Sequence, residues 1–143
     1  MAQTATAETP RAPERSPLKG GVVPYLMLEG AAEAIEFYKT ALGAEEVDER
    51  ACMPDGRILN ARIDVNGGSI MLMDPMPEHG HPAATHKGFN LHLHVDDADA
   101  WFDRAVAAGC EVVMPMSLQF WGDRYGMVRD RFGVTWAFGT TPA

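Results

Sequence analysis

The chain has 143 residues, of which 46% are hydrophobic, so a single domain can bury enough apolar surface to fold without disulfides. Its formal net charge of −8 at pH 7 offers no basic surface to a phosphate backbone, which argues against nucleic acid as a partner. No apolar run approaches the roughly 20 residues of a membrane helix and the first residues lack the apolar centre of a secretory signal, so we expect a cytoplasmic protein without a membrane partner.

The start of the chain differs in composition from the rest. Its first 19 residues are rich in Ala, Thr, Pro and charged side chains without apolar periodicity, which predicts a disordered tail. Residues 20–143 are predicted to form one domain, which opens with a buried strand within Val22–Leu28. A helix over Ala31–Leu42 follows, because its apolar residues recur on one face and Gly43 can end it at a positive φ angle.

Three further strands complete the first half of the domain. An extended segment is predicted around Glu45–Cys52, and apolar residues then alternate with polar ones from Leu59 to Val65. Asn66-Gly67 is typical of a tight hairpin, from which Ser69–Met73 returns as the next strand. The first half, residues 20–74, therefore has the predicted order βαβββ.

The second half, residues 88–140, repeats this order after a polar connection. A buried strand within Phe89–Val95 precedes a helix that Asp96 or Asp97 can cap and that ends near Ala108. The remaining strands are predicted at Glu111–Met116, Arg124–Arg129 and Val134–Gly139.

An internal repeat is visible in the sequence itself. The segment AAEAIEFYKTALGAEEV from Ala31 aligns without a gap with DADAWFDRAVAAGCEVV from Asp97. Such self-similarity predicts two copies of one structural unit. We therefore expect an α+β fold of two tandem βαβββ modules in a pseudo-twofold arrangement, with a ligand cleft between the modules.

Several motifs along the folded part resemble one known superfamily. They are PYLMLEGAAEAIEFYKTALGAE, GGSIMLMD, LHLHVDDADAWFDRAVAAGCEV and WGDRYGMVRDRFGVTWAF. Together they resemble the vicinal-oxygen-chelate superfamily of glyoxalases, bleomycin-resistance proteins and extradiol dioxygenases, and within it a PhnB-like member. The resemblance implies the glyoxalase/bleomycin-resistance fold over about residues 21–139.

The resemblance also implies where a divalent metal ion would bind. Metal-dependent members place His and Glu ligands on the first and last strands of each module. In this chain those positions fall on Val23 or Pro24, Met71 or Leu72, Asn90, and Ala137. Only Asn90 offers a donor atom, and a weak one, whereas a catalytic site normally needs three protein ligands. We therefore expect no metal cofactor, and the divalent metal remains an alternative with a displaced ligand set drawn from Asp74, His92, His94 and Asp130.

Three polar residues share one face of a predicted strand. Asn90, His92 and His94 alternate with leucines, so they should face the cleft while the leucines face the helix. An imidazole there can donate to a ligand, act as a general base or bind a metal ion. The alternative is a pair of hydrogen-bonded strand histidines without a functional role.

Aromatic and apolar side chains are expected to complete the cleft. Tyr25 and Met27 should face it from the first strand, together with Trp121, and such side chains suit an aromatic or apolar ligand. Arg124, with Tyr125 beside it, is predicted to receive an anionic group, although a salt bridge to a neighbouring aspartate is an equal alternative. The same apolar residues are also expected in an ordinary core or in a dimer interface.

These patterns predict a PhnB-like protein that has no metal ion and binds a small aromatic or apolar molecule between its modules. Such a protein could sequester its ligand, as antibiotic-resistance proteins of the superfamily do. One alternative is a metal-dependent lyase, isomerase or dioxygenase. Another is a dimeric interaction module without a small-molecule role. We also expect a homodimer, because two-module members of the superfamily commonly pair.

Overall fold

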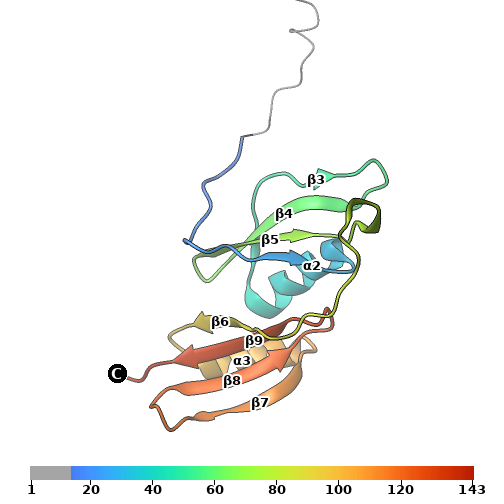
Figure 1. The fold of residues 1–143 in the computed structure, drawn as a ribbon. Helices are drawn as coiled ribbons and strands as arrows, with labels where there is room; N and C mark the ends of the chain where they lie inside the picture. The colour runs from blue at the N-terminus through green and yellow to red at the C-terminus, as the bar shows by residue number, and fades with distance from the viewer. Residues whose placement is uncertain (1–13) are drawn as a thin grey trace, which may run out of the picture.

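The computed structural model describes residues 14–143, so most of the predicted N-terminal tail lies outside the described residues. The first module packs helix α2 (Ala31–Leu42) on a five-stranded sheet with the order β1-β5-β4-β2, in which β3 also pairs with β4 (Figure 1). Strand β1 is parallel to β5, and the other pairs are antiparallel. The strands are β1 (Tyr25–Met27), β2 (Glu45–Glu46), β3 (Ala51–Cys52), β4 (Ile58–Val65) and β5 (Gly68–Met73).

The second module repeats the first with helix α3 (Ala98–Ala107) and a four-stranded sheet of order β6-β9-β8-β7. Strand β6 runs parallel to β9, as β1 does to β5. Its strands are β6 (Leu91–His94), β7 (Glu111–Leu118), β8 (Arg124–Arg129) and β9 (Thr135–Thr140). The prediction of an α+β fold with two βαβββ modules is confirmed.

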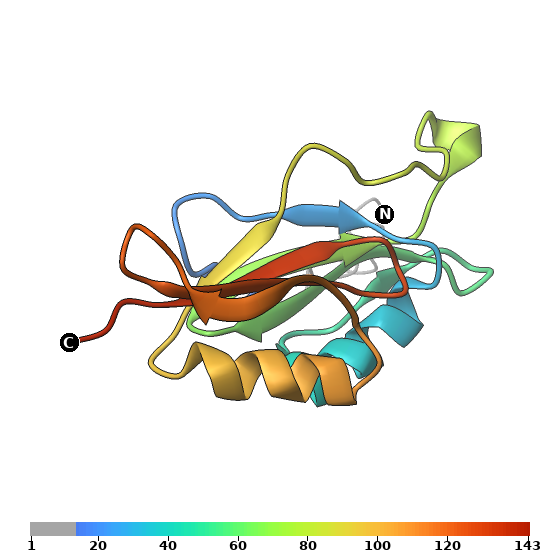
Figure 2. The ribbon, with the colours of Figure 1, turned by 90° about the horizontal axis from the view of Figure 1, so that it is seen from below.

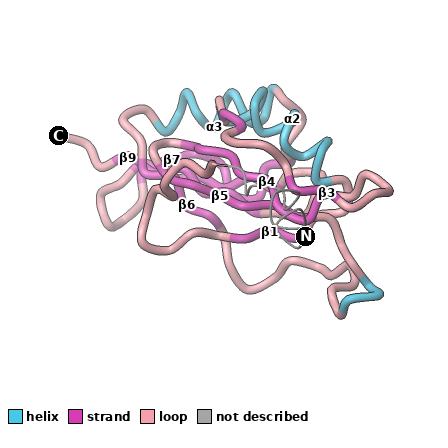
Figure 3. The backbone as a smooth tube through the Cα atoms, turned by 90° about the horizontal axis from the view of Figure 1, so that it is seen from above, coloured by secondary structure: helices cyan, strands magenta, loops and turns pink. Residues whose placement is uncertain are grey.

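Helices α2 and α3 cover the same side of the two sheets, whereas the opposite side carries the connection between the modules with its short 3-10 helix η1 (Pro77–His79) (Figures 2 and 3). We call this second side the open face. Alternation along the strands sends apolar side chains such as Leu72, Leu93 and Phe138 to the helices, where they are buried. The polar and aromatic side chains between them therefore lie on the open face.

A buried carboxylate ties the two modules together. Asp130, in the turn after β8, accepts hydrogen bonds from the Tyr38 hydroxyl at 2.6 Å and from Trp136 Nε1 at 2.8 Å. Its other oxygen accepts the backbone N–H groups of Phe132 and Val134. Because Tyr38 belongs to α2 of the first module, this network fixes α2 against the second sheet.

Most element boundaries match the prediction, and the differences have local causes. Helix α2 has the predicted ends, with Gly43 at φ 65°, and Asp97 rather than Asp96 caps α3 by accepting the Ala100 N–H. The extended segment predicted at Glu45–Cys52 is instead two short strands, because Asp48 takes a positive φ of 67° between them. Strand β7 extends to Leu118, two residues beyond the prediction.

Residues 14–19, which we call the N-terminal strap, were predicted as the end of the tail. They have no helix or strand, but they lie across the open face of the first module. Ser16 donates through its N–H and hydroxyl to Asp48, and its carbonyl accepts from Arg62 at 2.7 Å. Lys19 and Ser69 exchange two further hydrogen bonds. Arg62 is only 3% exposed beneath this strap.

Candidate functional site

The open face of the second module carries a cluster of aromatic rings. His92 and His94 alternate on β6 with Leu91 and Leu93, as the sequence predicted. The His92 ring stacks on Tyr125 of β8 with centroids 5.7 Å apart and an interplanar angle of 15°. Trp121, in the hairpin before β8, meets Tyr125 edge to face at 5.6 Å. Three of the predicted site residues, His92, Tyr125 and Trp121, therefore lie together.

A chain of hydrogen bonds links the two histidines to the end of the protein. His92 Nε2 lies 3.0 Å from His94 Nδ1, and His94 Nε2 lies 2.9 Å from the hydroxyl of Thr141. This arrangement requires the glycine on the neighbouring strand, because a Cβ atom at Gly139 would lie 2.7 Å from His92 Cε1. The His92 ring is thus held by a stacking partner, a hydrogen bond and a backbone without a side chain beneath it.

The protonation of His92 is shifted towards the neutral form. Partial burial lowers the pKa of His92 below its ordinary 6.5, and the nearby charge of His94 lowers that pKa further, while Asp123 acts in the opposite direction. The imidazole therefore remains uncharged at neutral pH. A neutral ring can accept a proton or a hydrogen bond.

Arg124 does not lie where the sequence analysis placed it. Its guanidinium forms two 2.8 Å hydrogen bonds with Asp99 in the first turn of α3, on the helix side of the sheet. The reason is the alternation of β8, which sends Arg124 and Tyr125 to opposite faces. Arg129, four residues after Tyr125, shares the open face and pairs with Glu111 at 3.5 Å. Of these two arginines, Arg129 is the one that lies on the open face.

Tyr25 and Met27 lie on the open face of the first module, apart from the His92 cluster. The Tyr25 hydroxyl donates to the carbonyl of Leu59 and accepts from Asn60 Nδ2 at 3.0 Å. Leu59 and Asn60 both belong to β4. The structure therefore divides the predicted site residues between two sheets.

A pocket of about 220 Å³ lies at the seam between the modules, and we call it the seam pocket. Asn90 and His92 line it from the second module, while Lys19 and Ser69 line it from the first. Its other walls are mostly apolar and are formed by Val22, Pro24, Val65, Ile70, Leu91, Leu93 and Trp136. An apolar cavity with a few convergent polar groups is typical of a small-molecule site.

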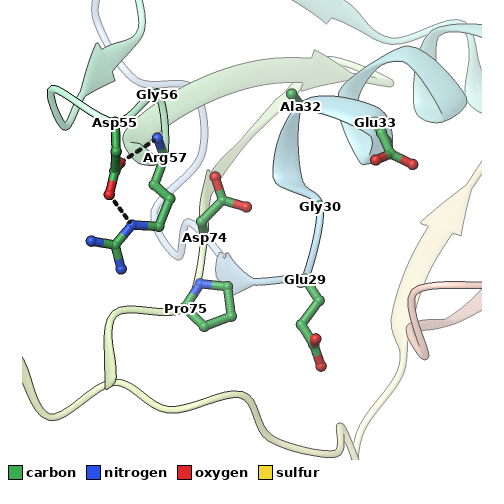
Figure 4. Close-up of a pocket in the computed structure, with 9 residues that line it drawn as sticks. All are labelled: Glu29, Gly30, Ala32, Glu33, Asp55, Gly56, Arg57, Asp74 and Pro75. Carbon is green, nitrogen blue, oxygen red and sulfur yellow. Dashed lines mark hydrogen bonds and ion pairs between the residues drawn. The ribbon is translucent and has the colours of Figure 1, made fainter. Parts of the chain in front are cut away.

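Another pocket, of about 440 Å³, lies at the first turn of α2 and is acidic (Figure 4). Two of its polar side chains, Asp74 and Arg57, are already engaged. Asp74 accepts the N–H groups of Ala31 and Ile58, and Arg57 is paired with Asp55 and Glu78. Asp74 thereby supplies the N-terminal cap of α2 from a distant strand end.

The donor set does not fit the metal ion that the family's metal-dependent members hold. Among residues 14–143, no three His, Cys, Asp or Glu side chains lie close enough together to bind one ion. Of the displaced set considered from the sequence, Asp74 is bonded to backbone N–H groups and Asp130 is buried with four donors. Only His92 and His94 remain adjacent.

Comparison with known proteins places this chain in a family. The chain belongs to the glyoxalase/bleomycin resistance protein/dioxygenase superfamily, whose family model matches residues 26–138. It is 41% identical over 122 residues to an uncharacterized protein of Mycobacterium tuberculosis, Rv0887c, covering 81% of this chain and 71% of that protein. It is 33% identical to the protein YjdN of Escherichia coli, with 79% and 90% covered.

Solved structures give the same result. The crystal structure of TioX from a Micromonospora species superposes with a TM-score of 0.69 at 26% identity, covering 86% of this chain and 99% of that one. Protein PA1353 from Pseudomonas aeruginosa has a TM-score of 0.67 at 31% identity, with 83% and 96% covered. A PhnB protein from Bacillus cereus, at 21% identity and a TM-score of 0.64, shares the fold. No helix among the described residues is long and apolar enough to span a membrane.

Three features of the site were missed in the sequence. Lys19 had been assigned to the tail, and its contact with Ser69 joins residues 50 positions apart, which no local pattern reveals. Gly139 carries a weak signal, since a glycine inside a strand often marks a close approach. Ser69, buried beside Asp64, lies at the start of a strand that the sequence did predict.

Proposed function

We propose that this protein binds a small, mostly apolar aromatic molecule in the seam pocket, without a metal ion. The observation that supports this proposal is the composition of the pocket, in which apolar side chains of both modules surround a few polar groups. A cavity shared by two modules gives each of them part of the ligand contact. Sequestration of the ligand, as in a resistance protein, follows from such a pocket without any reaction.

The absence of a metal ion in this proposal is supported by the residues present. The four positions that the resemblance assigns to metal ligands carry Val23 or Pro24, Met71 or Leu72, Asn90 and Ala137, and Asn90 Nδ2 contacts the sulfur of Met127 at 3.8 Å. One amide among apolar side chains does not hold a catalytic divalent ion. Metal analysis of the purified protein should give well under one Zn, Ni or Fe per chain.

The pocket can be tested by filling it. Gly68 lines the seam pocket at an ordinary φ angle, and a Cβ atom there would lie no closer than 3.7 Å to a neighbour. Gly68→Leu should therefore fold and should weaken single-ring aromatic ligands at least tenfold, about 1.4 kcal/mol, in a ligand-observed NMR titration. Gly21→Leu is the matched control, because a Cβ atom at Gly21 meets nothing within 4 Å.

The two variants separate the outcomes. Loss of ligand binding in Gly68→Leu with full binding in Gly21→Leu supports the pocket. Equal binding in both would show that the ligand lies elsewhere, for example on the open face around Tyr125. Binding that requires added Zn²⁺ or Ni²⁺ would favour the metal-dependent alternative.

A second proposal concerns the assembly, and it is supported by exposed aromatic residues beside the open face. Phe120 is 97% exposed, and Trp121 and Tyr25 are about half exposed. A monomeric protein seldom leaves such side chains uncovered, and they are typical of an interface. We propose that two copies pair through their open faces.

A further inference from the structure

We propose that the ligand of the seam pocket is a single-ring aromatic lactam, a planar ring with an N–H group next to a carbonyl, and that the unpaired backbone edge of β6 recognises these two groups. This inference rests on the proposed function, because it concerns the same pocket. It adds the chemical class of the ligand and the two groups that bind it, the carbonyl of Asn90 and the backbone N–H of His92.

The edge of β6, and not its side chains alone, borders the seam pocket. Four consecutive residues line the cavity, from Asn90 to Leu93. Their side chains alternate, because the His92 ring lies on the open face against Tyr125 whereas Leu93 is buried under the helices. A cavity that touches residues of both orientations in succession lies beside the strand, where the backbone N–H and C=O groups point.

The orientation of these backbone groups follows from the pairing of β6, which has a neighbouring strand on one side only, β9. The N–H of Val95 donates to the carbonyl of Gly139 at 2.9 Å, so Val95 faces β9. Successive residues of a strand face opposite edges, so His94 faces the first module, and its carbonyl accepts a 3.1 Å hydrogen bond from Asn66 Nδ2 there. Two residues earlier, His92 has the same orientation as His94.

The groups on this edge lack partners in the described part of the chain. Asn90 continues the alternation, and among residues 14–143 no hydrogen bond reaches its carbonyl or the backbone N–H of His92. The facing wall is mostly apolar, and its Ser69 hydroxyl already donates to Asp64. Backbone groups that line a cavity are normally hydrogen-bonded, so a ligand that supplies one donor and one acceptor is favoured here.

A lactam matches the spacing of the two groups. In a parallel pair of strands, one residue donates to a carbonyl and accepts from the N–H two positions further along the neighbouring strand. A ring with adjacent N–H and C=O groups repeats this pattern at Asn90 and His92. An extended peptide cannot continue along the same edge, because Asn66 already bonds to the next group, the carbonyl of His94.

The volume of the pocket limits the ligand to one ring. The cavity of about 220 Å³ exceeds the roughly 150 Å³ that suffice for benzene in an apolar protein cavity. Ile70, Leu91 and Trp136 provide apolar contacts for the faces of the ring. The lactam edge then bonds to β6 while the rest of the ring remains in apolar surroundings.

Two isomeric probes test the inference on the full chain. 2-Pyridone carries its N–H next to its carbonyl, whereas 4-pyridone consists of the same atoms with the two groups at opposite ends of the ring. The wild type should bind 2-pyridone at least about tenfold more tightly in a ligand-observed NMR titration, because only this isomer can make both backbone hydrogen bonds.

Two variants at one position separate the backbone from the side chain. His92→Pro removes the N–H, and an edge strand tolerates proline where the N–H makes no bond within the sheet. This variant should bring the two affinities within about twofold. His92→Ala removes the imidazole but keeps the N–H, so it should still prefer 2-pyridone.

Amide hydrogen exchange tests the same contact without a substitution. Saturating 2-pyridone should slow the exchange of the His92 N–H at least about tenfold, and saturating 4-pyridone should not. The N–H of Leu93, a residue that faces β9, is the internal control and should exchange at one rate throughout. This measurement decides the question if His92→Pro does not fold.

Toluene, a single ring without polar groups, separates this inference from the proposed function. If toluene binds and Gly68→Leu abolishes its binding, but the two pyridones bind equally or not at all, the inference is overturned and the apolar pocket stands. A preference for 2-pyridone that persists in His92→Pro, or that is lost in His92→Ala, also overturns it, as does unchanged exchange of the His92 N–H. If toluene and both pyridones fail to bind, the inference and the proposed function both fail.

Discussion

At the scale of single residues, Asp130 carries the largest concentration of hydrogen bonds in the core. It is 4% exposed, and its oxygens accept four donors from both modules. Asp130→Asn replaces one acceptor oxygen with an N–H₂ group that faces donors. We expect the free energy of unfolding to fall by about 2 to 4 kcal/mol, measured by urea denaturation. The matched control is Asp103→Asn on the exposed side of α3, and equal losses in both variants would contradict the role of Asp130.

His92 should also affect how stability depends on pH. Its pKa is lowered in the folded state by burial and by His94, so the folded protein binds this proton less readily than the unfolded chain. The stability due to the neutral ring is complete above the ordinary pKa of 6.5 and decreases as the pH falls through the lower, folded value. Thermal unfolding between about pH 7.5 and about pH 5 should show a smaller loss in His92→Asn than in the wild type.

The control for this measurement is His81→Asn, in the exposed connection between the modules. This variant should keep the pH dependence of the wild type. A wild-type profile in His92→Asn would mean that His92 is equally accessible to protons in both states.

At the scale of helices and strands, periodicity predicted the elements whose ends depend on neighbouring residues and missed the features that depend on residues distant in sequence. Helix α2 and strand β8 were predicted with their observed ends, because an apolar face and its terminating residues are adjacent in sequence. The cap of α2 was missed because Asp74 supplies it from 43 positions away. The break at Asp48 was missed because an aspartate at positive φ is uncommon, so the residue type at this position does not predict a break in the strand.

The same contrast holds for the candidate site. Strand alternation predicted that Asn90, His92 and His94 share a face, and the rings of His92 and His94 do lie together, with Nε2 of His92 3.0 Å from Nδ1 of His94. It also placed Arg124 wrongly, because an odd spacing shows that Arg124 and Arg129 face opposite sides but not which side each one faces. The ion pair with Asp99 decides that question, and it depends on how α3 packs on β8.

The N-terminal strap allows a test at this scale. It covers Arg62 and bonds to Asp48 and to Asn60, so its removal exposes a guanidinium that is now 3% accessible. Deleting residues 1–18 should lower the free energy of unfolding by about 1 to 3 kcal/mol, the sum of a few partly exposed hydrogen bonds. The control is the deletion of residues 1–12, which keeps the whole strap. Identical urea midpoints for the two deletions would show that the strap adds nothing to the fold.

At the scale of the whole molecule, the proposed assembly depends on the open face. The helix side is complete, since α2 and α3 cover both sheets and Arg104 of α3 donates to the Thr40 carbonyl of α2 at 2.8 Å. On the other side the sheets present uncovered rings. A twofold dimer that placed one open face on another would bury the same patch in both copies, as closed symmetry requires.

The proposed pairing, with a dissociation constant in the micromolar range or below, predicts a dimer in sedimentation velocity at about 50 μM. Phe120→Ser should shift the protein towards the monomer, because it removes the most exposed aromatic side chain beside the open face without touching the core. Val106→Ser, at a partly exposed position of α3 on the helix side, should remain dimeric. A wild-type monomer at this concentration would exclude the pairing. Dissociation of Val106→Ser with retention of the Phe120→Ser dimer would instead locate the interface on the helices, and the open face would then remain accessible to ligands in every copy.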